Sequence, residues 1–129
     1  LSAVETVTNK IPSTLEAGAL CKMADRGQIT GGILDGPLAF DNAVSAVAAA
    51  TKGIRSAVAG QADILLVPDI ESGNMLAKQL EYLADASAAG IVVGARVPIV
   101  LTSRADSAES RAASTAIAVA MVHARGGKA

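Results

Sequence analysis

The chain alternates short runs rich in β-branched residues with alanine-rich segments of helical period. This alternation is typical of a layered α/β protein, in which helices cover a sheet. Residues 62–67, ADILLV, form a compact aliphatic run closed by Pro68, which predicts a fully buried strand. The other predicted strands are residues 4–8, 29–34, 90–94 and 98–101.

Helical segments accompany these strands. The first begins at Pro12, with Ser13 and Glu16 in capping-box spacing, and it is predicted to end at Gly27. A further helix is predicted after Pro68, because leucines recur there at helical spacing. These leucines are Leu76, Leu80 and Leu83.

Two more helices are predicted from capping residues and from apolar residues that recur at helical spacing. One has Asp41 as its cap and Gly53 as its stop. Its predicted buried stripe is Val44, Val47 and Ala48. The last helix has Asp106 as its predicted cap, and the negative charge of Glu109 is expected to interact favourably with the helix dipole. Its apolar face is Ala113, Ala116, Ile117, Ala120, Met121 and Ala124.

Composition excludes several classes of function. A net charge of -1 and 11 basic residues spread along 129 positions give no basic patch for nucleic acid or an acidic membrane surface. No apolar run approaches the roughly 18 to 20 residues that cross a bilayer, and the first residues lack the pattern of a signal peptide. We therefore expect a cytoplasmic protein. With only Cys21 and His123, we expect neither a disulfide nor a bound metal.

Three polar loops follow predicted strands: Asp35-Gly36, residues 69–74 and residues 102–106. Open α/β sheets bind ligands at the carboxyl ends of their strands, so these loops predict a cleft. Each loop also has a structural interpretation. Asp35 suits a tight turn, Asn74 suits a helix cap, and Asp106 suits the cap already named.

Ser103 and Arg104 stand between the last predicted strand and the last helix. Backbone N–H groups at a helix start favour an anion, and a serine and an arginine beside them add donors. A solvated loop is the alternative. No Gly-x-Ser-x-Gly elbow, Walker loop or Gly-x-Gly-x-x-Gly fingerprint is present. The residues alone therefore predict an α/β domain with an anion-binding end.

Three stretches carry a resemblance to a known family: ITGGILDGPLAFDNA at 29–43, GQADILLVPDIESGNMLAKQLEYLA at 60–84, and GARVPIVLTSRADS at 94–107. Together they resemble the carboxyl-terminal half of the phosphate acetyl/butyryltransferase family. The SRADS variant looks closest to phosphate butyryltransferases and to the acyltransferase half of bifunctional enzymes with an enoyl-CoA hydratase domain. The resemblance implies reversible transfer of an acyl group between coenzyme A and inorganic phosphate. Both are substrates, and no cofactor or metal is required.

The resemblance also implies a fold and a division of the chain. Family members have two α/β domains of the isocitrate/isopropylmalate dehydrogenase type, a three-layer α/β/α fold, and the active site lies between them. Residues 1–98 would supply the second domain, and residues 99–129 a strand and helix that return to the first. The start at Leu1, without methionine, favours a fragment. We expect such a fragment to be inactive alone and the whole protein to be a homodimer.

The implied site residues match the family motif one by one. Ser103 would hydrogen-bond the thiol or the tetrahedral oxyanion, and Arg104 would bind phosphate through its planar fork. Gly73 and Asn74 match a Gly-Asn pair that we place at the cleft wall, and Asp35 belongs to the substrate-binding loops.

The chain departs from the family pattern at two positions. The family's proposed base aligns with Ser110, which leaves Asp106 as the nearest candidate carboxylate, and an arginine that contacts coenzyme A aligns with Tyr82. The alternative function is a non-catalytic nucleotide-binding or structural α/β module.

Overall fold

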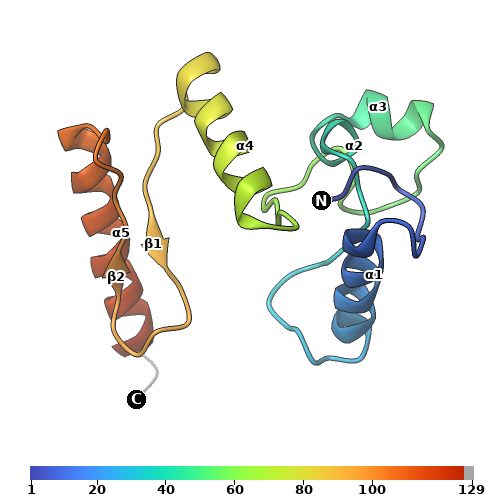
Figure 1. Ribbon diagram of the computed structural model, residues 1–129. Coiled ribbons are helices and arrows are strands. Elements are labelled where there is room, and N and C mark those ends of the chain that lie inside the picture. The colour runs from blue at the N-terminus through green and yellow to red at the C-terminus, as the bar shows by residue number, and fades with distance from the viewer. Residues whose placement is uncertain (127–129) are drawn as a thin grey trace. The chain divides into compact units, whose positions relative to one another are not determined.

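The computed structural model describes residues 1–126. The chain divides into two compact units, Leu1–Asn74 and Met75–Ala129, each of which is described by itself. Within residues 1–126 no helix is long and apolar enough to cross a membrane. In chain order (Figure 1), the elements are α1 (Pro12–Asp25), α2 (Phe40–Val44), α3 (Ala46–Thr51), α4 (Ile70–Leu83), β1 (Ile91–Val92), β2 (Ile99–Val100) and α5 (Ala108–Gly126).

Helix α1 begins and ends where the sequence predicts, but its predicted cap is wrong. Proline occupies the start of the helix, where its missing N–H costs nothing, and Gly27 follows the end with a φ of 72°. No side chain caps the helix. Because α1 begins at Pro12, Ser13 already lies inside the first turn, and its hydroxyl lies 2.9 Å from the hydroxyl of Ser2 instead.

The helix predicted between Asp41 and Gly53 is two short helices, α2 and α3. The chain is extended at Ser45, with φ -124° and ψ 112°, and the Ser45 hydroxyl accepts the Ala48 N–H at 3.3 Å as the cap of α3. Asp41 lies in the first turn of α2, and Ala39 occupies the cap position. Gly53, at a φ of 68°, follows the end of α3 as predicted.

The buried positions of α2 and α3 also differ from the predicted stripe. Val44 and Val47 are 44% and 77% exposed. The break at Ser45 changes the helix direction, so a stripe drawn through one continuous helix does not apply. The side chains that are buried here are Asn42, Ala43 and Ala49.

The three strands predicted in the unit Leu1–Asn74 are wrong. Residues 4–8, 29–34 and 62–67 pair with no strand in the part of the chain that the structure describes. In the aliphatic run at 62–67, Ile64 is 86% and Leu66 61% exposed, so the run is not the fully buried strand predicted. A buried strand needs the backbone of neighbouring strands on both sides, and none lies beside this run within residues 1–126.

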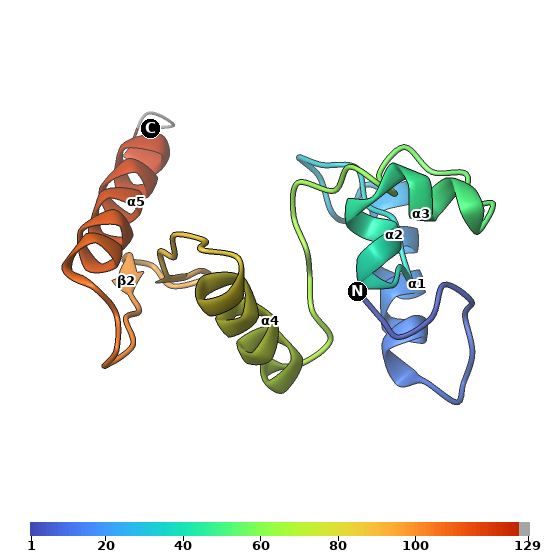
Figure 2. The same ribbon diagram turned by 90° about the horizontal axis from the view of Figure 1, so that it is seen from above.

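The two short strands predicted in the second unit are confirmed. Strands β1 and β2 pair antiparallel, with Ile91 opposite Val100 and Val92 opposite Ile99, and both contact α5 (Figure 1). Figure 2 shows β2 beside α5 from above. A Cβ on Gly90 would meet the Leu101 carbonyl oxygen at 2.6 Å, so the close pairing at this end requires glycine. This hairpin is the only sheet among residues 1–126, and it carries the loop that leads into α5.

Candidate functional site

A tight turn at residues 103–106 joins β2 to α5. The Asp106 N–H donates to the Ser103 carbonyl at 3.2 Å, and the Ser103 N–H donates to Asp106 Oδ2 at 2.6 Å. The Ala105 N–H donates to Ser103 Oγ at 3.4 Å. A serine whose own N–H is held by an acid three residues later has the pattern of a capping box. The pattern here closes an isolated turn, which we call the SRAD turn.

Helix α5 has its own capping residue, Ser107, directly after this turn. It begins at Ala108, and the Ser110 N–H donates to Ser107 Oγ at 3.1 Å. The predicted cap, Asp106, is therefore wrong, because its carboxylate is bound to the Ser103 N–H and lies outside the helix. Glu109 does lie in the first turn, where its charge suits the helix dipole as predicted.

The start of α5 is fixed to the β-hairpin through Ser114. This buried side chain accepts the Gly90 N–H at 2.9 Å and donates to the Ser110 carbonyl at 2.7 Å. A second bond joins the far end of the helix to the hairpin, from Arg125 Nη1 to the Ala95 carbonyl at 3.1 Å. The SRAD turn therefore joins β2 to α5, two elements that are held together by hydrogen bonds between α5 and the β-hairpin.

Two functional groups stand exposed on the turn. Ser103 and Arg104 are both exposed, and within residues 1–126 the Arg104 guanidinium makes no hydrogen bond or ion pair. The Ser103 oxygen accepts a backbone N–H, which leaves its hydroxyl proton available to another acceptor. A hydroxyl donor and a planar cation on adjacent residues suit an oxyanion or a phosphate.

Lys78 adds a second cation to the same unit. Its Nζ lies 2.6 Å from Glu81 Oε2 and 5.7 Å from the centre of the Tyr82 ring. The hydrogen bond to Glu81 raises the pKa of Lys78, and the charges of Glu81, Tyr82 and Asp106 raise it further.

The other predicted binding residues lie in the unit Leu1–Asn74. Asp35 Oδ1 accepts the N–H of the next residue, Gly36, at 2.8 Å. Gly73 and Asn74 lie inside α4. The structure brings together Ser103, Arg104 and Asp106, which belong to the second unit. Asp35, Gly73 and Asn74 belong to the first unit.

Helix α4 is capped by Asp69, so the predicted cap at Asn74 is wrong. The Ser72 N–H donates to Asp69 Oδ1 at 2.7 Å, and this bond lowers the pKa of Asp69. Gly73 packs closely, since a Cβ there would lie 2.8 Å from Val67 Cγ2.

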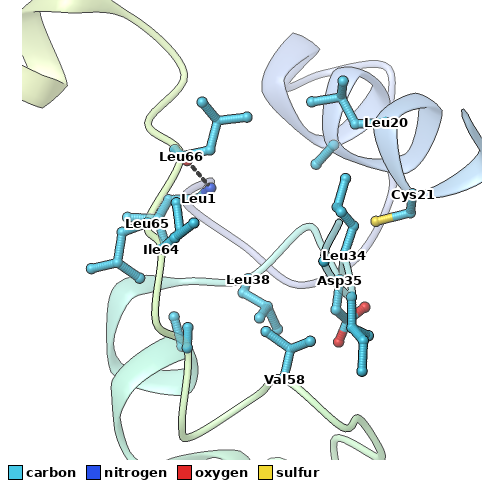
Figure 3. Close-up of a pocket in the computed structure, with 15 residues that line it drawn as sticks. Leu1, Leu20, Cys21, Leu34, Asp35, Leu38, Val58, Ile64, Leu65 and Leu66 are labelled. Carbon is cyan, nitrogen blue, oxygen red and sulfur yellow. Dashed lines mark hydrogen bonds between the residues drawn. The ribbon is translucent and has the colours of Figure 1, made fainter. Parts of the chain in front are cut away.

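The first unit also holds an open apolar pocket of about 310 Å³ (Figure 3). Cys21 is half-buried at the pocket wall, with its thiol 3.6 Å from the Gly36 carbonyl. Burial raises the pKa of this thiol, and the charges of Asp35 and Asp25 raise it further. Among the described residues, no three His, Cys, Asp or Glu side chains are grouped to hold a metal. Further lining residues are Leu1, Leu20, Leu34, Leu38, Leu65 and Leu66.

Comparison with known proteins identifies the class. Residues 1–119 match the family described as phosphate acetyl/butaryl transferase, and the chain belongs to that family. It is 72% identical over 118 residues to a phosphate acetyltransferase of Rhizobium meliloti, covering 92% of this chain and 37% of that protein. It is 53% identical over 118 residues to a phosphate butyryltransferase of Clostridium acetobutylicum, covering 92% of this chain and 39% of that protein.

A solved structure has a similar fold. A branched-chain phosphotransacylase from Enterococcus faecalis V583 superposes with a TM-score of 0.80 at 40% identity, over 95% of this chain and 44% of that one. The described part of the chain is therefore a mixed helix and strand structure similar to a phosphotransacylase. It spans 37% and 39% of the two curated relatives named above.

Proposed function

We propose that this chain is the carboxyl-terminal half of a phosphate acyltransferase. The whole protein would transfer an acetyl or butyryl group reversibly between coenzyme A and inorganic phosphate. The names of the relatives support the reaction, and the shares of 37% and 39% support a longer protein. Its fold would be the three-layer α/β/α type of isocitrate/isopropylmalate dehydrogenases, with residues 1–98 in the second domain and residues 99–129 returning to the first.

Exposed apolar side chains support a longer protein. The run at 62–67 is a strand by composition but has no neighbouring strand within the described residues, and Ile64 is 86% exposed. In a longer protein, a neighbouring strand would cover it. We also propose a cytoplasmic homodimer, since α5 exposes Ile117, Val119 and Val122 for packing against another surface.

The observation that carries the proposed chemistry is the exposed pair Ser103 and Arg104 on the SRAD turn. A phosphate oxygen attacks the thioester carbonyl carbon, the carbon–sulfur bond breaks, and the coenzyme A thiolate leaves. Arg104 would hold the phosphate through its two-pronged guanidinium, and Ser103 would donate its proton as a hydrogen bond to the oxyanion or the departing sulfur. The reaction is an acyl substitution with no change in oxidation state, so we propose no cofactor and no metal.

A chimera tests this function. The 118 matching residues of the Rhizobium meliloti phosphate acetyltransferase are replaced by those of this chain, and release of coenzyme A from acetyl-CoA is measured with phosphate present. We expect activity. Arg104→Lys keeps the charge but loses the fork, so kcat/KM should fall by much more than about tenfold. Ser103→Ala should raise the barrier by roughly 3 kcal/mol.

The control is Arg96→Lys, which changes another exposed arginine of the same unit and should leave turnover intact. All variants should melt at the same temperature as the parent chimera. A folded chimera without activity would instead favour the non-catalytic module. Near-normal turnover in both turn variants would remove Ser103 and Arg104 from the chemistry.

A further inference from the structure

We propose that Asp106 is a positioning residue that fixes the backbone of Ser103 and Arg104, and that it is not the base of the reaction. The inference rests on the proposed function. It comes from the juxtaposition of the Asp106 carboxylate and the Ser103 N–H, whose nitrogen lies 2.6 Å from Oδ2. The family resemblance left this carboxylate as the nearest candidate for a base, and the geometry assigns it another task.

The turn is closed by two hydrogen bonds between the same residues. Asp106 accepts the Ser103 N–H with its side chain and donates its own N–H to the Ser103 carbonyl at 3.2 Å. Arg104 lies between these anchored positions. Because both ends of the turn are held, the direction in which the Arg104 side chain leaves the backbone depends on the Asp106 carboxylate.

A base must lie within hydrogen-bond reach of the proton that it removes. Within residues 1–126, the hydrogen bond of the Asp106 carboxylate goes to the backbone N–H of Ser103, and none joins it to the Ser103 hydroxyl. That hydroxyl oxygen is occupied by the Ala105 N–H at 3.4 Å. The geometry thus connects Asp106 to the shape of the turn and shows no hydrogen bond between its carboxylate and the Ser103 hydroxyl.

The reaction itself places little demand on a base in the direction that forms acyl phosphate. Inorganic phosphate near neutral pH already carries a deprotonated oxygen that can attack the thioester. The departing sulfur needs a hydrogen-bond donor, which the Ser103 hydroxyl supplies in the proposed mechanism. A residue that only accepts the Ser103 N–H needs an oxygen at the right place and no negative charge.

Asparagine distinguishes the two roles, because its amide oxygen can accept the Ser103 N–H but cannot take a proton as a base. In the active chimera we expect Asp106→Asn to keep kcat/KM within about threefold of the parent, since only the charge assistance of one hydrogen bond is lost. Asp106→Ala should lower kcat/KM by more than about tenfold, because a displaced catalytic group is costly. The loss should fall mainly on KM for phosphate and spare KM for acetyl-CoA.

The rate of amide hydrogen exchange in the peptide that contains Ser103 reports how firmly the SRAD turn is held, and it does not depend on turnover. We expect fast exchange in Asp106→Ala and near-parent exchange in Asp106→Asn. Ser107→Ala is the matched control, because it removes the neighbouring cap of α5 and should lower the melting temperature without changing KM for phosphate.

The inference is overturned if Asp106→Asn loses as much kcat as Asp106→Ala, which is the result for a base. It is equally overturned if Asp106→Ala leaves Ser103 exchange unchanged. An inactive parent chimera would refute the proposed function, and the exchange measurement would still judge the role of Asp106 in the turn.

Discussion

Replacing Ser114 with alanine should detach α5 from the β-hairpin. The buried Ser114 hydroxyl accepts the Gly90 N–H at 2.9 Å, and alanine would leave that donor unsatisfied. Leaving this half-buried donor unsatisfied costs about 2 kcal/mol, while alanine returns about 0.5 kcal/mol of helix propensity. Losing the bond to the Ser110 carbonyl costs little, because that carbonyl lies in the α5 backbone ladder. The net loss should be about 1.5 kcal/mol.

Thr115 provides a matched control on the same helix. Its hydroxyl also donates to the carbonyl four residues earlier, at 3.0 Å to Arg111, but it is exposed and accepts nothing from the hairpin. Thr115→Ala should therefore be neutral or slightly stabilising. The difference of about 2 kcal/mol between the two variants isolates the Gly90 hydrogen bond.

The assay is hydrogen exchange at the Gly90 amide, followed together with urea unfolding. A loss of about 2 kcal/mol at this bond should speed local exchange about 30-fold in Ser114→Ala. Thr115→Ala should leave Gly90 exchange unchanged. Equal exchange rates and equal unfolding midpoints in the two variants would refute the idea that Ser114 holds α5 to the hairpin.

Two further predictions concern the first unit. The hydrogen bond from Lys52, at 2.6 Å, lowers the pKa of Glu5. The Glu5 carboxylate therefore stabilises the fold at pH values above its ordinary pKa of 4.5, and this stabilisation is lost as the pH falls through the lowered pKa. Melting temperatures measured against pH should fall on acidification and fall less steeply in Glu5→Gln; parallel curves would contradict this. Gly60→Ala should destabilise strongly, because its Cβ would lie 2.5 Å from Ala46 Cα at a φ of 85°. Gly53→Ala has the strain of positive φ but meets nothing within 4 Å, so thermal melting should show a smaller loss, and equal losses would exclude the clash as the cause.

Local backbone signals were readable from the sequence. Pro12 begins α1 because its fixed φ and missing N–H suit the first helical position. Gly27 and Gly53 follow helix ends because both adopt positive φ, which glycine reaches without strain. Each of these outcomes depends on one residue's own conformational range, so distant parts of the chain do not change it.

Pairing and capping were harder to predict. The run at 62–67 has the composition of a strand, but a strand forms only where another backbone offers its N–H and C=O groups. In the stretch SRADSAES, Ser103 and Ser107 lie four residues apart, and each is able to start a capped turn. The spacing alone did not show that Ser107 rather than Asp106 caps α5. The bond between Ser114 and Gly90 fixes the helix against the hairpin, and this bond joins residues 24 positions apart.

The sequence by itself placed Ser103, Arg104 and Asp106 close together, because residues three apart in a turn lie near one another. It also indicated the family, through motifs at residues 29–43, 60–84 and 94–107, and the family model matches residues 1–119. Only the tertiary structure decided that the Ser114 hydroxyl accepts the Gly90 N–H at 2.9 Å and so fixes α5 to the β-hairpin. The physical reason is that a hydrogen bond or a Coulomb interaction depends on distances and directions, which packing sets and residue order does not.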